Sequence, residues 1–140
     1  AYFGEKDFQQ LAIIRELVHR LGLPVQLVPC PTLREPDGLA MSSRNQLLSP
    51  EERKKAPLMA ELLAKSRTFA LNHTVAETIA FVKNGLAEEP LFRLDYFEIC
   101  DGYTLQPVDS WESADYIVGC IAAYCGHVRL IDNIVYKHVD

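Results

Sequence analysis

The chain has 140 residues, 49% of them hydrophobic, which is enough for one ordinary domain, or for one small domain and part of another, with a buried core. Its net charge of −5 argues against a surface that coats nucleic acid, and no apolar run reaches the roughly 18 residues that a membrane-spanning helix needs. The four cysteines lack CxxC spacing, so we interpret them as buried free thiols of a cytoplasmic protein rather than as zinc ligands: Cys30, Cys100, Cys120 and Cys125.

The first thirty residues follow the pattern of a βαβ unit. Ala1-Tyr2-Phe3 is typical of the end of a buried strand. A helix is predicted to begin near Asp7, because apolar residues recur at helical spacing as far as Leu21. Gly22 is expected to end this helix, and the apolar run at 25–28 predicts a second strand. Two strands joined by a helix in this way should be parallel.

This arrangement brings two polar segments to one sheet edge. Ligands of such folds gather at the carboxyl ends of the strands, where Lys6 and the residues after Cys30 both fall. Lys6 can contact a phosphate as a point charge, because the start of a helix favours anions. Asp7 can cap the helix, accept a hydrogen bond from a ribose hydroxyl, or do both, and Gln10 can bind a polar substrate. The alternative is that Asp7 is only a cap and Lys6 is only solvated.

Met41-Ser42-Ser43-Arg44-Asn45 is the most informative run in the chain. Two hydroxyls, a guanidinium and a carboxamide fall close together on a connecting segment, and this composition suits a polyanion such as a triphosphate. Arginine offers a planar fork of donors to phosphate oxygens, and hydroxyls and backbone N–H groups can complete the cradle. The alternative is a polar loop that caps the next helix. We interpret the preceding charged residues, Arg34, Glu35 and Asp37, as a solvated turn.

A second region, predicted to begin near Asn45, has the pattern of a small antiparallel α+β unit. Ser49-Pro50-Glu51-Glu52 and Thr74-Val75-Ala76-Glu77 are two capping boxes that each predict a helix start. Pro57 should kink or split the first helix, and Asn84-Gly85 should end the second. Three strands of one antiparallel sheet are then predicted at Leu94–Cys100, Val118–Tyr124 and Val128–Ile134.

Three of these segments resemble the pantothenate synthetase family. Phe3-Gly4-Glu5-Lys6-Asp7-Phe8-Gln9-Gln10-Leu11 resembles the family's lysine loop and the helix that follows it. The run from Thr32 to Asn45, which includes Arg-Glu-Pro-Asp-Gly-Leu-Ala-Met-Ser-Ser-Arg, resembles its counterpart of the KMSKS loop of class I aminoacyl-tRNA synthetases. Arg129-Leu130-Ile131-Asp132-Asn133 resembles its closing strand. The order and spacing agree, and the likeness runs over the whole chain.

The resemblance implies an α/β fold. Residues 1–44 would be the last βα unit of a Rossmann-like ATP-binding nucleotidylyltransferase domain, and residues 45–140 a C-terminal α+β lid domain with a three-stranded antiparallel sheet. It also implies an ATP-dependent ligase of coenzyme A precursor synthesis. Such an enzyme adenylates pantoate, releases pyrophosphate, and then joins the pantoyl group to β-alanine to give pantothenate and AMP. We expect a homodimer when the enzyme is full length, and Mg²⁺ ligands outside this chain.

The resemblance also implies a role for each matching residue. The phosphates would be held by Lys6, Ser42, Ser43 and Arg44, which are the expected catalytic residues. The rest of the ATP site would comprise Gly4 and Asp7 at the ribose, Leu33 and Met41 at the adenine, and Glu5 in the same turn. Gln10 would bind pantoate.

One family signature is absent from these 140 residues. The HxGH-type element, which supplies histidines to the triphosphate, has no match here, nor has the first pantoate-binding glutamine. The likeness therefore covers roughly the second half of the enzyme, and we expect the chain alone to be inactive. The alternatives are a non-catalytic nucleotide- or phosphate-binding module, or another nucleotidyl-transferring enzyme that shares only the phosphate loop.

Overall fold

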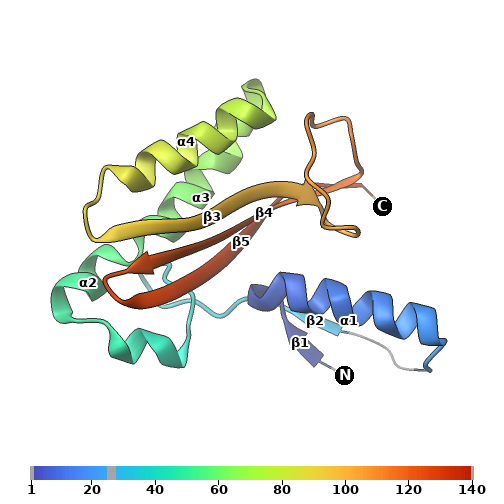
Figure 1. Ribbon diagram of the computed structural model, residues 1–140, viewed down its shortest axis with the longest axis horizontal. Helices are drawn as coiled ribbons and strands as arrows, with labels where there is room; N and C mark the ends of the chain where they lie inside the picture. The colour runs from blue at the N-terminus through green and yellow to red at the C-terminus, as the bar shows by residue number, and fades with distance from the viewer. Residues whose placement is uncertain (1, 25–27, 140) are drawn as a thin grey trace.

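A computed structural model gives the arrangement of the chain and describes residues 2–24 and 28–139. The side chains of residues 2, 3, 5 and 28–30 lie outside that description. Figure 1 shows a short parallel pair of strands with one helix near the N-terminus, and a longer three-stranded sheet with two helices on one side. No helix among the described residues is long and apolar enough to cross a membrane.

The predicted parallel pair is confirmed. Strand β1 (Tyr2–Gly4) pairs in parallel with β2 (Val28–Cys30), so that Gly4 lies opposite Cys30. A 3₁₀ turn, η1 (Glu5–Asp7), follows β1 and leads into helix α1 (Phe8–Leu21). Residues 25–27 of the predicted second strand lie outside the described residues.

Helix α1 ends as predicted, because Gly22 adopts a left-handed φ of 60° and its N–H donates back to the helix carbonyls. Its predicted apolar face divides into two parts. Phe8, Leu11 and Ala12 are buried, and Phe8 packs against the long sheet. Further along, Leu17 is 51% exposed, and Ile13 and Leu21 on the same stripe of the helix are exposed as well.

Both predicted capping boxes are confirmed, with the serine or threonine side chain and the later glutamate exchanging hydrogen bonds with the backbone. Pro57 splits the first helix as predicted, because it stands between two separate helices. The helices and 3₁₀ turns of this region are η2 (Ser43–Leu47), α2 (Pro50–Lys55), α3 (Leu58–Phe69), η3 (Ala70–Asn72) and α4 (Val75–Ala87).

The predicted end of the last helix is wrong, because α4 continues through Asn84-Gly85 to Ala87. Gly85 faces α3 rather than capping its own helix. A Cβ atom at position 85 would lie 2.5 Å from the Leu62 Cδ2 atom. The glycine therefore serves the close approach of two helices.

The three predicted strands are confirmed, and each is longer than its apolar run. They are β3 (Phe92–Asp101), β4 (Tyr116–Cys125) and β5 (Val128–His138), which are antiparallel in the order β3-β4-β5. Helices α3 and α4 cover one face, and the start of α1 lies against the other (Figure 1). Three of the predicted free thiols are buried in or beside this sheet, namely Cys100, Cys120 and Cys125; the Cys30 side chain lies outside the described residues.

Candidate functional site

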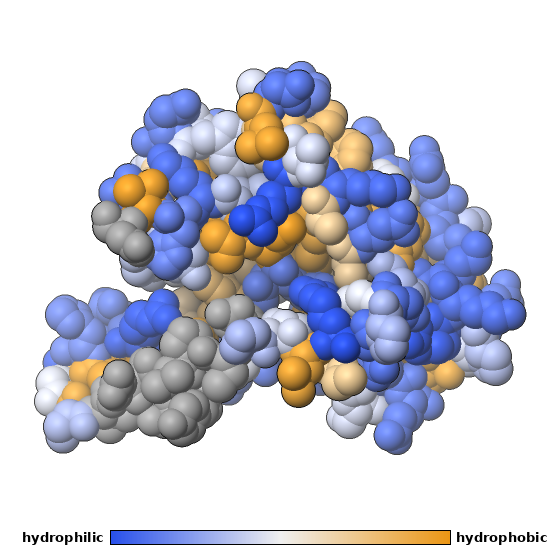
Figure 2. Space-filling model, turned by 180° about the vertical axis from the view of Figure 1, so that it is seen from behind, coloured by the Kyte–Doolittle hydropathy of each residue, from blue (hydrophilic) through white to orange (hydrophobic). Residues whose placement is uncertain are grey.

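Two cavities meet where η1 passes the edge strand β5, and Lys6, Asp7 and Arg129 line both of them. The first has a volume of about 260 Å³ and is also lined by Ser42 and Arg44. The second has a volume of about 180 Å³, and its further lining residues include Gln9, Gln10, Tyr96 and Asn133. Seen from behind, the molecule is hollowed near its centre, and both hydrophilic and hydrophobic residues border the hollow (Figure 2).

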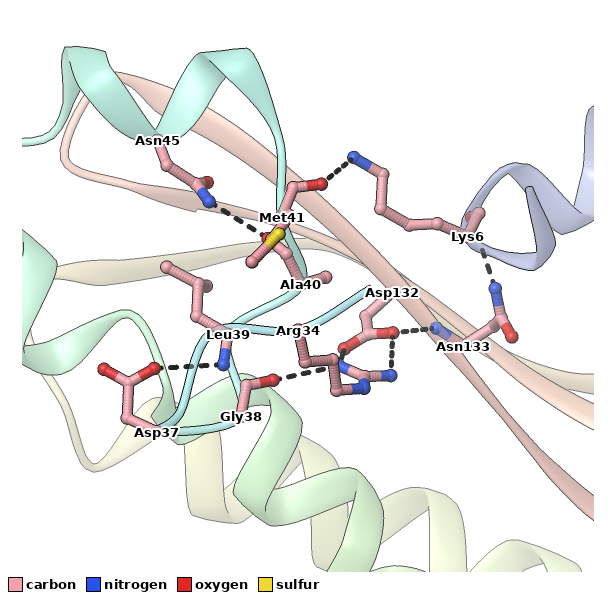
Figure 3. Close-up of polar contacts among 10 residues, drawn as sticks. All are labelled: Lys6, Arg34, Asp37, Gly38, Leu39, Ala40, Met41, Asn45, Asp132 and Asn133. Atoms are coloured by element: carbon pink, nitrogen blue, oxygen red, sulfur yellow. Dashed lines mark hydrogen bonds and ion pairs between the residues drawn. The ribbon is translucent and has the colours of Figure 1, made fainter. Parts of the chain in front are cut away.

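The predicted meeting of the lysine turn with the later polar loop is confirmed. The Lys6 Nζ atom donates a hydrogen bond of 3.3 Å to the Met41 carbonyl oxygen (Figure 3). Asp7 stands at the start of α1 but makes no side-chain capping hydrogen bond. Its carboxylate is therefore not needed by the helix, in contrast to the interpretation of Asp7 as a cap only.

The loop itself is shaped by short-range hydrogen bonds. The Ser42 Oγ atom accepts from the Arg44 N–H at 3.2 Å and so caps η2. The Asn45 side-chain amide donates to the Ala40 carbonyl at 3.0 Å, while its own Oδ1 atom is buried without a partner among the described residues. These contacts leave an unpaired acceptor beside the first cavity, which Asn45 also lines.

Arg34 is exposed beside the turn, as interpreted, but it is also paired with a residue far away in the sequence. Its guanidinium forms two parallel hydrogen bonds to the Asp132 carboxylate of β5, at 2.7 and 2.8 Å. Asp132 is only 3% exposed, and this side-chain hydrogen bond raises the pKa of Arg34. Asp37 is also paired, with Arg53 of α2 at 2.6 Å. The turn is therefore solvent-exposed as interpreted, and the sequence did not reveal its two ion pairs because both partners are far away along the chain.

The structure brings together only some of the residues predicted for the site. Lys6, Asp7, Ser42 and Arg44 line the first cavity, and Gln10 lines the second with Lys6 and Asp7. Among described residues, the predicted ATP-site residues that line neither cavity are Gly4, Leu33, Met41 and Ser43. The Glu5 side chain lies outside the description.

Leu33 and Met41 nevertheless lie next to each other, because the Met41 N–H donates to the Leu33 carbonyl at 2.9 Å. Their side chains are exposed. The chain between them folds back through a turn at Gly38, whose φ of 95° suits glycine.

Three residues of the closing strand belong to the site but were not predicted to do so. Arg129, Asp132 and Asn133 line one or both cavities, although the sequence placed them only in a strand. Their signal was the presence of two charges and an amide within an otherwise apolar strand. Charged side chains in such a position need partners.

The charges around the first cavity favour an anion. Lys6 and Arg44 line it together with one carboxylate, Asp7, while Asp132 is neutralised by Arg34 and Arg129 pairs with Asp95 at 3.0 Å. In the part of the chain that the structure describes, no group of three or more His, Cys, Asp or Glu side chains is placed to hold a metal ion. The arrangement suits a ligand that carries several negative charges.

Known proteins resemble this chain closely. The family model described as pantoate-beta-alanine ligase matches residues 1–135. A pantothenate synthetase of Bacteroides fragilis is 60% identical over 137 residues, which are 98% of this chain and 49% of that protein. One of Porphyromonas gingivalis is 54% identical over 137 residues, with the same two shares.

Solved structures of proteins with these names also resemble this chain. A pantothenate synthetase of Thermus thermophilus superposes with a TM-score of 0.90 at 46% identity, covering 98% of this chain and 49% of that chain. A pantoate-beta-alanine ligase of Francisella tularensis, complexed with beta-gamma ATP and beta-alanine, gives 0.63 at 29% identity, covering 96% and 42%. The chain spans about half the length of the curated relatives it matches. It belongs to the pantoate-beta-alanine ligase family.

Proposed function

We propose that this chain forms the phosphate-binding part of an enzyme that condenses pantoate with β-alanine, using ATP and passing through pantoyl adenylate. The observation that carries the proposal is the contact of Lys6 with the Met41 carbonyl, which sets the lysine against the Ser42–Arg44 loop across one cavity. The ATP-complexed relative supports ATP as the substrate.

In the first step, the pantoate carboxylate attacks the α-phosphorus of ATP, and the bond to the β-phosphate oxygen breaks. Negative charge grows on the α-phosphate oxygens and on the departing pyrophosphate. The ammonium of Lys6 and the guanidinium of Arg44 stabilise this charge, and the hydroxyls of Ser42 and Ser43 donate to phosphate oxygens. These four residues therefore act on the transition state.

In the second step, the β-alanine amine attacks the carbonyl carbon of the mixed anhydride. AMP leaves with the bonding electrons, and the new amide nitrogen loses a proton. Gln10 would hold pantoate throughout, since it lines the second cavity beside Lys6. Gly4 and Asp7 would contact the ribose, with Glu5 in the same turn, while Leu33 and Met41 would meet the adenine through backbone groups.

Mg²⁺ would neutralise charge on the phosphates when bound. The residues described here fit an ion held mainly by phosphate oxygens, because Arg34 occupies the Asp132 carboxylate and Asp7 is the other carboxylate that lines the first cavity. Its remaining ligands would lie outside this chain.

We also propose the division into a Rossmann-like remnant, residues 1–44, and a lid domain, residues 45–140, with the phosphate loop close to the hinge. A homodimer and a cytoplasmic location stay predictions. Sedimentation of the full-length protein and cell fractionation would test them.

The proposed function can be tested in a completed enzyme, meaning this chain joined to the part of the Bacteroides fragilis relative that it does not span. The completed enzyme should catalyse pantoate-dependent exchange between ATP and pyrophosphate. Lys6→Ala should slow the exchange by ~2.7–4 kcal/mol in barrier terms, as for loss of one charge-stabilising donor. Lys65→Ala is the matched control, because Lys65 is an exposed lysine of α3 paired with Glu61.

Two outcomes would contradict the proposal. An unchanged rate for Lys6→Ala would remove this residue from the site. Binding of ATP without any exchange in the completed enzyme would favour the non-catalytic module instead.

A further inference from the structure

Two consecutive residues of β5 hold both halves of the candidate site. Successive side chains of a strand point to opposite faces of the sheet. Asp132 faces the side covered by α3, with Leu130 and Ile134, whereas Asn133 faces the side where α1 begins. Since β5 is an edge strand of its sheet, the backbone between these two residues runs along the boundary of the two cavities.

The Asp132 side holds the phosphate loop. The two carboxylate oxygens of Asp132 accept one hydrogen bond from each terminal nitrogen of the Arg34 guanidinium. The same guanidinium also donates to the Gly38 carbonyl at 3.0 Å. Asp132 Oδ1 further accepts from the Asn133 N–H at 2.8 Å, which fixes its orientation. A bidentate pair with a buried carboxylate constrains angle as well as distance. The loop is thereby fixed to the strand at a point shortly before its serines.

The Asn133 side holds the lysine turn. Its side-chain amide donates to the Lys6 carbonyl oxygen at 3.2 Å, and the side chain of the same lysine reaches the Met41 carbonyl (Figure 3). The backbone of Lys6 is therefore fixed to β5, while its ammonium points to the loop. The two cationic sides of the first cavity share one anchor.

We propose that Asp132 and Asn133 are positioning residues that set the separation between Lys6 and the Ser42–Arg44 loop. The inference rests on the proposed function. Asp132 cannot serve as a direct phosphate ligand, because a carboxylate repels a polyanion and this one is already paired. It acts through Arg34, and Asn133 acts through Lys6. A catalytic group that moves by about 1 Å can cost on the order of 100-fold in rate.

The test measures pantoate-dependent exchange between ATP and pyrophosphate by the completed enzyme. Asn133→Ala and Asp132→Asn should each lower kcat by about 10- to 100-fold while changing KM for pantoate by less than about threefold, since the groups that bind substrate remain. Arg34→Lys keeps the charge that compensates Asp132 but removes the fork, so it should show the same loss and serves if Asp132→Asn does not fold. Arg53→Gln is the control, because it breaks an ion pair of the same loop on its solvent side.

A second comparison separates positioning from general stability. In a Lys6→Ala background, Asn133→Ala should lower kcat by less than about twofold, because a residue that acts through Lys6 has nothing left to position. Thermal unfolding of each variant is measured alongside. The same fold-loss in both backgrounds, or a loss in Arg53→Gln equal to that in Arg34→Lys, would overturn the proposal.

Failure of the proposed function gives a different result. If the unsubstituted completed enzyme shows no exchange, the proposed function fails, and positioning is then judged in the 140-residue chain by amide hydrogen exchange. Asp132→Asn should increase amide hydrogen exchange at Glu35 and Met41, because their N–H groups make the hydrogen bonds that close the loop. Arg53→Gln should not increase it. Equal amide hydrogen exchange at Glu35 and Met41 in the two variants would refute the positioning role.

Discussion

Two arginines of one loop have different surroundings. Arg34 is held by Asp132 and Gly38, so its donors are used within the protein. Arg44 lies further along the loop, lines the first cavity and has no carboxylate partner among the side chains that the structure describes. An arginine with free donors beside a cavity is the one suited to an incoming anion.

Arg44→Lys should therefore fail to restore function. One ammonium keeps the charge but cannot copy two parallel hydrogen bonds to phosphate oxygens, so the exchange rate of the completed enzyme should fall at least about tenfold, as expected for loss of about 1.4 kcal/mol of transition-state stabilisation. Arg53→Lys is measured as the control. Near-normal kinetics for Arg44→Lys would show that a positive charge is sufficient there.

The buried thiol at the end of β4 should make stability depend on alkaline pH. Burial, and then the nearby carboxylates Glu52 and Glu89, raise the pKa of the Cys125 thiol to about 11. In the unfolded chain a thiol titrates near about 8.5, so the unfolded state loses its proton first. The Cys125 thiol therefore contributes fully to the free energy of unfolding below about pH 8.5, and this contribution is lost as the pH rises toward 11.

Urea unfolding of the 140-residue chain at about pH 8 and about pH 10.5, on either side of most of this titration, measures the effect. Cys125→Ala should remove this part of the pH dependence, so the stability difference between the unsubstituted chain and the variant should shrink at the higher pH. Tyr136, whose pKa burial raises to about 12, is present in both proteins and cancels. A difference independent of pH would contradict the assignment to Cys125.

At the scale of elements, the turn between β4 and β5 supports the start of α2. Gly126 adopts a φ of 61°, and a Cβ atom there would overlap the Glu52 carboxylate. Glu52 in turn accepts from the Ser49 N–H at 2.8 Å in the capping box of α2. A side chain at position 126 would therefore displace the Glu52 carboxylate from this cap.

Gly126→Ala should lower the free energy of unfolding by about 2–3 kcal/mol. About 1–2 kcal/mol comes from the left-handed backbone of a residue with a side chain, and about 1 kcal/mol from the displaced cap. Denaturant unfolding measures the change. In a Glu52→Ala background only the backbone term should remain, and an undiminished effect there would mean that Glu52 is not what the new methyl group displaces.

At the scale of the whole molecule, α1 carries an exposed apolar stripe. Its members follow helical spacing: Ile13, Leu17 and Leu21, which are 63%, 51% and 61% exposed. The first turns of the same helix are buried against the sheet through Phe8 and Leu11. Contiguous exposed apolar surface of this kind favours association.

We therefore expect the 140-residue chain to self-associate, with residues 1 to about 40 less protected than the sheet. Replacing Ile13, Leu17 and Leu21 together by serine should shift sedimentation toward the monomer. Leu71→Ser is the control, since Leu71 is 85% exposed but lies away from α1. A monodisperse monomer with strongly protected amides from Phe8 through α1 would contradict this expectation. The chain should also bind ATP weakly and make no pantothenate.

The sequence alone determined the features that depend on neighbours along the chain. Both capping boxes, the stop at Gly22 and the split at Pro57 rest on contacts within a few residues, which side-chain chemistry and backbone preference decide locally. The meeting of Lys6 with the later loop also followed, because two parallel strands leave few places for what comes after them.

Only the tertiary structure decided what depends on distant partners. Arg34 and Asp132 are 98 residues apart, so nothing near Arg34 revealed that the two are paired. Gly85 was predicted to end a helix, because the sequence does not show that Leu62 lies against it. The physical reason is the same in both cases: ion pairing and packing depend on position in space, and the folded sheet and helices alone set that position.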